Sequence, residues 1–210
     1  EAELVSRHLV RSNLMGHDSH GVGMLPAYIR NLTAKVLNPN RSAQCIKDDG
    51  SIMIFDGQWG YGQRVAKEAM DAAITRCRQT GVVLLALRQA HHIGRVGSYG
   101  EQSIDAGLVS LHFVNVIGHN PLVAAHGGSQ ARFTTNPLCI AMPGTDKTPA
   151  ILLDMATSRV ALGKVRVAKN KGAEMAEGLL IDANGHPSRD PNIMFSQPQG
   201  ALLPFGEHKG

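Results

Sequence analysis

The sequence Gly16-His17-Asp18-Ser19-His20-Gly21 places two imidazoles, a carboxylate and a hydroxyl between two glycines. The spacing of apolar residues predicts a short helix before this stretch and another after it. Asp18 or Ser19 is suited to cap the second helix, because a short polar side chain can accept a hydrogen bond from a free N–H of the first turn. We therefore expect His20 where a helix N-terminus meets a flexible glycine, a place that can expose a titratable group to a ligand.

Simpler interpretations of this stretch stay open. Asp and Ser before a helix are most often only caps, and a single histidine nearby is most often a surface residue. The pair His17 and His20 also has a spacing that metal ligands use, but two ligands without a nearby cysteine are a weak indication of a metal site.

Composition places the chain among globular proteins. It has 210 residues, of which 43% are hydrophobic and 18% charged, and a net charge of +4, so it can form one large domain or two small ones. No run approaches the ~18 apolar residues of a membrane helix, and three widely spaced cysteines indicate reduced thiols, so we expect a cytoplasmic protein. The basic run 164–171 lacks aromatic neighbours, which argues against nucleic-acid binding and favours a solvated helix end.

The order of expected elements predicts the fold class. Helices are expected over 1–14, from 25, over 63–79, 96–106 and 159–169, and strands over 44–48, 51–55, 82–87, 108–114, 138–142, 151–155 and 179–182. Asp49-Gly50, between the first two expected strands, is typical of a two-residue hairpin turn. The continuous apolar run 82–87 is typical of a buried central strand. We therefore predict an α/β (α+β) fold, with a helical N-terminal arm over 1–43 and a mixed-sheet nucleotide-binding domain over 44–210.

Polar residues follow three of the expected strands, where ligands commonly bind. They are His91 and His92, Asn115 with His119, and Asp154 with Thr157. No G-x-G-x-x-G follows a strand, and no Walker loop, G-x-S-x-G or Cys-x-x-Cys is present. A Rossmann domain is therefore disfavoured, and a dinucleotide would have to bind in another way.

Several motifs occur together and in order along the chain. They are 18–21, His92 with Gly94, 135–137, 153–157 and 208–210. With them, the sequence resembles the malate/L-lactate dehydrogenase family of non-Rossmann oxidoreductases. The resemblance implies an NAD(P)-dependent homodimeric enzyme that interconverts 2-hydroxy and 2-oxo acids, with NAD the favoured cofactor and no metal. Family members continue beyond the last motif, so the chain is expected to be truncated at its C-terminal end.

The resemblance also implies roles for single residues. His20 would be an acid/base and substrate ligand with Ser19 beside it, His92 a second histidine that accepts the proton in some members, and Tyr28 a substrate contact. The cofactor would be bound by a segment and by residues of neighbouring loops: Asp154, Met155, Ala156 and Lys209, together with His119, Asn136 and Thr157.

Met24 departs from the family pattern. Many members have an arginine there, four residues after the first histidine, where it can bind the substrate carboxylate. Arg95 is our candidate to replace it as a substrate ligand, and a surface arginine is the equally weighted alternative. The more apolar Met24 points to larger, even aromatic, 2-oxo acids.

Two other functions stay open at this point. One is a metal-dependent hydrolase using His17, His20 and His92, and the other is a non-catalytic oligomerising or binding module. For the dehydrogenase, the expected partners are a small acid substrate and a second copy of the chain, with neither nucleic acid nor membrane.

Overall fold

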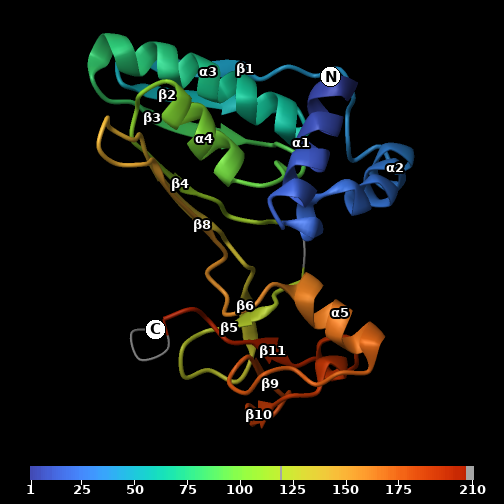
Figure 1. The fold of residues 1–210 in the computed structure, drawn as a ribbon. Helices are drawn as coiled ribbons and strands as arrows, with labels where there is room; N and C mark the ends of the chain where they lie inside the picture. Colours follow the sequence, from blue (N-terminus) through green and yellow to red (C-terminus); the bar gives the residue numbers. More distant parts are fainter. Residues whose placement is uncertain (119, 207–210) are drawn as a thin grey trace. The chain divides into compact units, whose positions relative to one another are not determined.

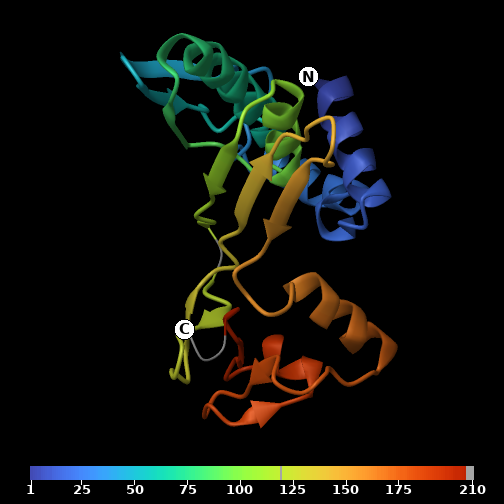
Figure 2. The same ribbon diagram turned by 60° about the vertical axis from the view of Figure 1, so that its left-hand side comes forward.

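The computed structural model describes residues 1–118 and 120–206, and its class is mixed α/β, as predicted (Figures 1 and 2). The helices are α1 (Ala2–Leu14), α2 (Leu25–Thr33), α3 (Gly62–Thr80), α4 (Gly97–Asp105) and α5 (Leu162–Lys171), with three 3-10 helices, η1 (Asp18–His20), η2 (Val22–Met24) and η3 (Pro191–Met194). The strands are β1 (Gln44–Asp49), β2 (Ile52–Asp56), β3 (Leu84–Arg88), β4 (Ser110–Phe113), β5 (Val123–Ala124), β6 (Ala131–Phe133), β7 (Leu138–Met142), β8 (Ile151–Met155), β9 (Leu180–Ile181), β10 (Pro187–Ser188) and β11 (Ala201–Leu202). None of the described helices is long and apolar enough to cross a membrane.

The chain divides into two compact units. The first comprises residues 1–110 and 140–152, and the second comprises 111–139 and the chain from 153 onward. Their strands form three sheets, in the orders β1-β2-β3, β4-β7-β8 and β10-β9-β11-β5-β6. The expected division into a helical arm over 1–43 and a nucleotide-binding domain over 44–210 stays a prediction.

A three-stranded sheet and helix α3 form one layered part of the first unit (Figure 1). β1 pairs antiparallel with β2 through the predicted Asp49-Gly50 turn, and β3 joins β2 in parallel. One face of the sheet packs on α3 through Phe55 and Ala69, with Leu85 beside them. The interpretation of 82–87 as a buried central strand is wrong for the described sheet. β3 lies at its edge, and Leu84 is 67% exposed because alternate side chains face away from α3.

The N-terminal helices have a small core of their own. Val5, Leu9 and Tyr28 are buried together with Leu37, which confirms the apolar face predicted for the first helix. The face predicted for the second is wrong in part, because Leu25 and Ile29 are exposed. The expected cap is wrong: residues 18–20 form η1 instead, and α2 has no side-chain cap at its start. The reason is local, because the Asp18 carboxylate accepts a hydrogen bond from the Asn13 side chain of α1.

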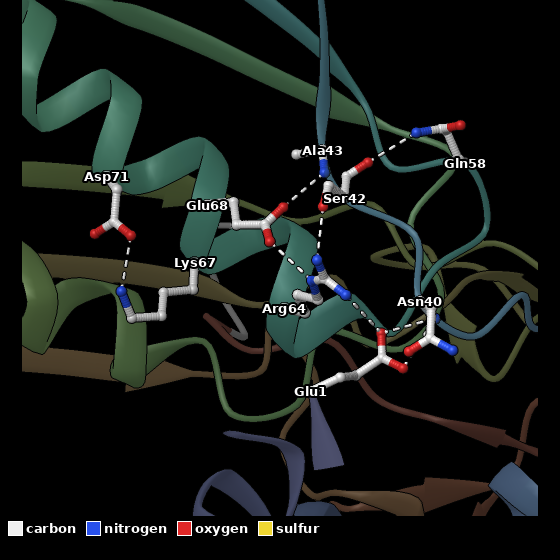
Figure 3. A network of polar contacts seen from close by, with 9 residues as sticks. All are labelled: Glu1, Asn40, Ser42, Ala43, Gln58, Arg64, Lys67, Glu68 and Asp71. Carbon is white, nitrogen blue, oxygen red and sulfur yellow. Dashed lines mark hydrogen bonds and ion pairs between the residues drawn. The ribbon is translucent and has the colours of Figure 1, made fainter. Parts of the chain in front are cut away.

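A polar network fixes the beginning of α3 (Figure 3). The Arg64 guanidinium donates to Glu68 at 2.8 Å, to the Ser42 hydroxyl at 2.7 Å and to Glu1 at 3.4 Å. The Glu1 carboxylate in turn accepts from the Asn40 backbone N–H at 2.9 Å. These bonds tie the first turn of α3 to the chain terminus and to the segment before β1, and so hold the helix end that carries Gly62 and Gln63.

The second unit has a five-stranded sheet of short strands. β11 pairs in parallel with β5 and antiparallel with β9. Helix α5 packs its buried Val165 against Val123, Leu180 and Leu202 of this sheet. Most of these strands have only two residues, which is too short for an alternating pattern to show in the sequence.

Candidate active site

The loop that carries His20 is held by one asparagine of α1. The Asn13 Nδ2 donates to Asp18, and its Oδ1 accepts from the Val22 backbone N–H at 2.9 Å. Gly21 lies directly against this amide, since a Cβ there would be 2.2 Å from Asn13 Oδ1. The glycine after His20 is therefore required for close packing, and the two bonds fix the backbone on either side of the imidazole.

His92 is positioned by the segment that follows β3. This segment passes over the start of α3 so closely that a Cβ at Gly62 would lie 2.2 Å from the His91 carbonyl oxygen and 2.4 Å from that of His92. A backbone contact of this kind leaves the segment little freedom. The N-terminus of α3 therefore fixes the position of His91 and His92, which follow the third strand and were predicted to lie near a ligand.

Tyr28, His92 and His20 form a continuous hydrogen-bonded chain. The Tyr28 hydroxyl lies 2.7 Å from His92 Nδ1, and His92 Nε2 lies 2.9 Å from His20 Nδ1. The two imidazole rings stack with their centroids 5.1 Å apart and an angle of 17° between their planes. Three of the residues named from the sequence, far apart along the chain, are therefore brought together in the first unit.

The bonding pattern determines where the protons of this chain can lie. Since the two imidazoles share one hydrogen bond, the facing nitrogens hold a single proton between them. Burial raises the pKa of Tyr28 to about 12, although the hydrogen bond from Gln63 acts in the opposite direction. The tyrosine hydroxyl therefore keeps its proton at neutral pH, and the proton that can be exchanged belongs to the imidazole pair.

Two further histidines belong to the first unit. The His91 ring packs edge-on against Tyr28, and its Nε2 is 2.8 Å from the Asn31 Nδ2. His8 of α1 packs on Tyr99. Burial lowers the pKa of both imidazoles, and Arg11 adds to this effect at His8. Both rings are therefore biased towards the neutral form.

Ser19 and Arg95 have different surroundings from those of Tyr28, His92 and His20. Ser19 is exposed on η1 next to His20. Arg95 is only 4% exposed, and its guanidinium pairs with the Glu101 carboxylate at 2.9 Å, while Glu101 also binds Arg11 at 3.0 Å. This is not a surface arginine, and its ion pair gives it a structural role whether or not it binds substrate.

The expected cofactor residues belong to the second unit. Asn136 has a positive φ of 23°, its Oδ1 accepts from the Val116 backbone N–H at 3.0 Å, and its carbonyl accepts from the Thr157 hydroxyl at 3.0 Å. Both residues line a hollow of about 330 Å³ with apolar walls that include Phe133 and Phe205. The structure thus brings Asn136 and Thr157 together.

For the other predicted cofactor residues within the described chain, the structure gives a position in the fold but no shared hollow. Asp154 and Met155 end β8, and Ala156 follows them and leads to Thr157. Asp154 is close enough to His112 to oppose the lowering of its pKa by burial. His119 and Lys209 lie outside the described residues.

Several residues that complete the site were not predicted from the sequence. Gln63 donates from Nε2 to the Tyr28 hydroxyl at 2.6 Å, and Asn13 and Asn31 hold the loop of His20 and the ring of His91. Each is a polar residue on an otherwise amphipathic helix, which sequence patterns cannot distinguish from a solvent-facing position. Among the residues that the structure describes, no group of three His, Cys, Asp or Glu side chains is arranged to hold a metal ion.

Comparisons with known proteins agree with the motifs. The family model described as malate/L-lactate dehydrogenase matches residues 1–210. The L-lactate dehydrogenase of Cupriavidus necator is 48% identical over 100% of this chain and 60% of its own length, and hydroxycarboxylate dehydrogenase B of Escherichia coli is 47% identical over 100% of this chain and 58% of its own length.

Solved structures show the same fold. A structure from E. coli, 46% identical, superposes with a TM-score of 0.93 over 99% of this chain and 57% of that chain. Sulfolactate dehydrogenase from Methanocaldococcus jannaschii, 34% identical, superposes with a TM-score of 0.87 over 99% of this chain and 58% of that chain. This chain spans about three-fifths of the length of the curated relatives it matches, and with a family model covering all of it, it belongs to the malate/L-lactate dehydrogenase family.

Proposed function

We propose that the protein interconverts a 2-hydroxycarboxylate and a 2-oxocarboxylate, with a nicotinamide dinucleotide as the second substrate. The observation that carries this proposal is the hydrogen-bonded chain Tyr28–His92–His20. An imidazole titrates near neutral pH, so it can take the hydroxyl proton in one direction and return it in the other. The names of the relatives, which specify lactate, hydroxycarboxylate and sulfolactate, support the same acid class.

Within the hydrogen-bonded chain Tyr28–His92–His20, we assign to His20 the transfer of a proton to and from the substrate. His20 has the acid/base role that the family resemblance implies, and His92 bonds to it at Nε2 and to Tyr28 at Nδ1. In oxidation, His20 takes the hydroxyl proton at Nε2 as the C–H bond breaks and the C=O bond forms. The dinucleotide, when bound, supplies the acceptor or donor of the hydride and its two electrons.

The second unit has residues that fit a dinucleotide ring. The hollow lined by Asn136 and Thr157 combines amide and hydroxyl groups with the rings of Phe133 and Phe205, and its volume of about 330 Å³ lies at the lower end of the range for small-ligand sites. We propose that it receives one ring of the cofactor, with NAD favoured over NADP. The segment Asp154–Ala156 and the residues His119 and Lys209 stay predicted contacts.

The carboxylate of the substrate needs a cationic partner, and Arg95 stays our proposal for it. Arg95 and Arg11 both pair with Glu101, so two guanidiniums lie close together, and cationic groups attract an acid substrate. Ser19 and Tyr28 stay proposed substrate contacts, and a homodimer in the cytoplasm stays a prediction.

The test is oxidation of NADH, and of NADPH in parallel, by the full-length protein with a panel of aliphatic and aromatic 2-oxo acids. Turnover of any acid supports the reaction class, and a preference for aromatic acids supports the role of Met24 in widening the pocket. His20→Ala should then lose most of kcat. A folded protein that is inactive with both cofactors and the whole panel would refute the proposal.

A further inference from the structure

Gln63 is a fully buried polar side chain that the proposed reaction has not used. It lies in the first turn of α3 with 0% exposure, and its Nε2 donates to the Tyr28 hydroxyl at 2.6 Å. Its Oε1 is also buried and has no hydrogen-bond partner within 1–118 and 120–206. A buried acceptor without a partner is destabilising. An apolar side chain would avoid that cost, so the bond to Tyr28 is what distinguishes glutamine at this position.

The amide determines the direction of every hydrogen bond beyond it. An amide nitrogen can only donate, so the single Tyr28 hydroxyl proton is directed to His92 Nδ1. Neutral His92 then carries its proton on Nε2 and donates it to His20 Nδ1. Neutral His20 consequently carries its own proton on Nε2, and in this state that nitrogen has no lone pair with which to take a proton from a hydroxy acid.

A half-turn of the carboxamide reverses the whole chain. Oε1 then accepts from the Tyr28 hydroxyl, the Tyr28 oxygen accepts from His92 Nδ1–H, and His92 Nε2 accepts from His20 Nδ1–H. The proton count is unchanged, but His20 Nε2 now has a lone pair. Only this arrangement can act as the base.

We propose that Gln63 is a positioning residue whose carboxamide, by donating to or accepting from Tyr28, sets the direction of the Tyr28–His92–His20 chain and thereby the protonation site on His20. The inference rests on the proposed function. When His20 takes the substrate proton at Nε2, its Nδ1 proton moves to His92 Nε2, and His92 Nδ1–H stays bonded to the Tyr28 oxygen. The accepting amide therefore stabilises the charged imidazole pair, because it gives the Tyr28 proton a partner.

Other titratable and charged groups surround the chain and contribute to its titration. They are His91 on the same segment, Tyr61 before α3, His8 and Arg11 of α1, Arg95 in the loop before α4, and Tyr99 and Glu101 on α4. A substitution at Gln63 changes none of these groups. The difference in pH dependence between variants therefore reports on the side chain at position 63.

The first test is the pH dependence of kcat/KM in the full-length enzyme. Gln63→Met has a similar length but cannot donate and accepts only weakly through its sulfur, so the charged pair loses support and its apparent pKa should fall by about 1–2 units. Gln63→Glu supplies an acceptor with a negative charge, so the apparent pKa should rise by about 1 unit or more. Gln79→Met and Gln79→Glu, on the exposed end of the same helix, should leave the profile unchanged.

The second test needs no cofactor. Nitrogen-15 NMR of labelled histidines reports which ring nitrogen is protonated, and above the pKa of the pair we expect the Nε2–H form of His92 in the wild type and the Nδ1–H form in Gln63→Glu. Tyr28→Phe removes the link, and in this background Gln63→Glu should no longer change the tautomer.

The possible failures are separable. Unshifted profiles, shifts of equal sign in the two Gln63 variants, or an unchanged His92 tautomer in Gln63→Glu would overturn the inference. A wild type without dehydrogenase activity would refute the proposed function, and the NMR result would still decide the role of Gln63. If Gln63→Met does not fold, Gln63→Glu and the NMR measurement decide it.

Discussion

Replacing Gly62 by alanine should impair the site from a position that contacts no substrate. Gly62 is the first residue of α3, and alanine has the higher intrinsic helix propensity. The added Cβ, however, would lie 2.2 Å from the His91 carbonyl oxygen and 2.4 Å from that of His92. Because carbon and oxygen atoms in contact are well over 3 Å apart, the segment must move by roughly 1 Å.

The size of the effect follows from the two bonds of His92. They measure 2.7 Å to Tyr28 and 2.9 Å to His20, and a movement of about 1 Å takes at least one of them beyond hydrogen-bonding distance. A misplacement of that size costs about 100-fold in rate. Overpacking costs about 1–3 kcal/mol, so the free energy of unfolding should fall although the helix propensity of the new residue is higher.

The assay is kcat/KM with the best 2-oxo acid found in the substrate panel, together with urea unfolding of each variant. Gly23→Ala is the matched control, since a Cβ there meets no described heavy atom within 4 Å, and it should keep wild-type rates. A Gly62→Ala enzyme with kcat/KM within about twofold of wild type, or with increased stability, would refute the close backbone packing on which the position of His92 depends.

Three further outcomes are expected. Tyr28→Phe leaves the buried Gln63 Nε2 without its acceptor, so urea unfolding should show a loss of about 1–3 kcal/mol. Arg95→Ala leaves Glu101 with one of its two guanidiniums, so stability should fall by about 1–3 kcal/mol, and steady-state kinetics should show a raised KM for the oxo acid; an unchanged KM would remove Arg95 as the carboxylate ligand. Burial holds the pKa of His91 below 6.5, so the unfolded chain binds that proton more readily and the free energy of unfolding should fall as pH drops below about 6.5; His91→Gln should make this slope shallower.

Local patterns were sufficient for much of the fold. The spacing of apolar residues predicted α1, α3 and β7 nearly to the residue, and Asp49-Gly50 predicted the β1–β2 turn. The error at β3 has a physical cause. A run of apolar residues shows that a strand avoids water, but it does not show which neighbouring strand or segment covers each face.

The candidate site was predictable only in part. His20 and His92 stood out because imidazoles after strands and beside glycines are chemically conspicuous, and their closeness then followed from the fold. Gln63 and Asn13 did not, because each acts through one hydrogen bond made to a residue distant in sequence or in a separate element. Such partners are determined by tertiary packing, and no periodicity records them.

The burial of Tyr28 decides which group exchanges the proton. Tyr28 is 2% exposed, and its pKa of about 12 makes the phenolate inaccessible at neutral pH, so the tyrosine cannot be the final source or acceptor of a proton. Its single proton must therefore stay in one of two hydrogen bonds, to His92 or to Gln63. The position of that proton determines whether His92 Nδ1 can hold another one. A tyrosine that never ionises thus controls the charge of the imidazole pair. A phenylalanine in its place would leave both histidines present, but the direction of the hydrogen bond between them would no longer be fixed.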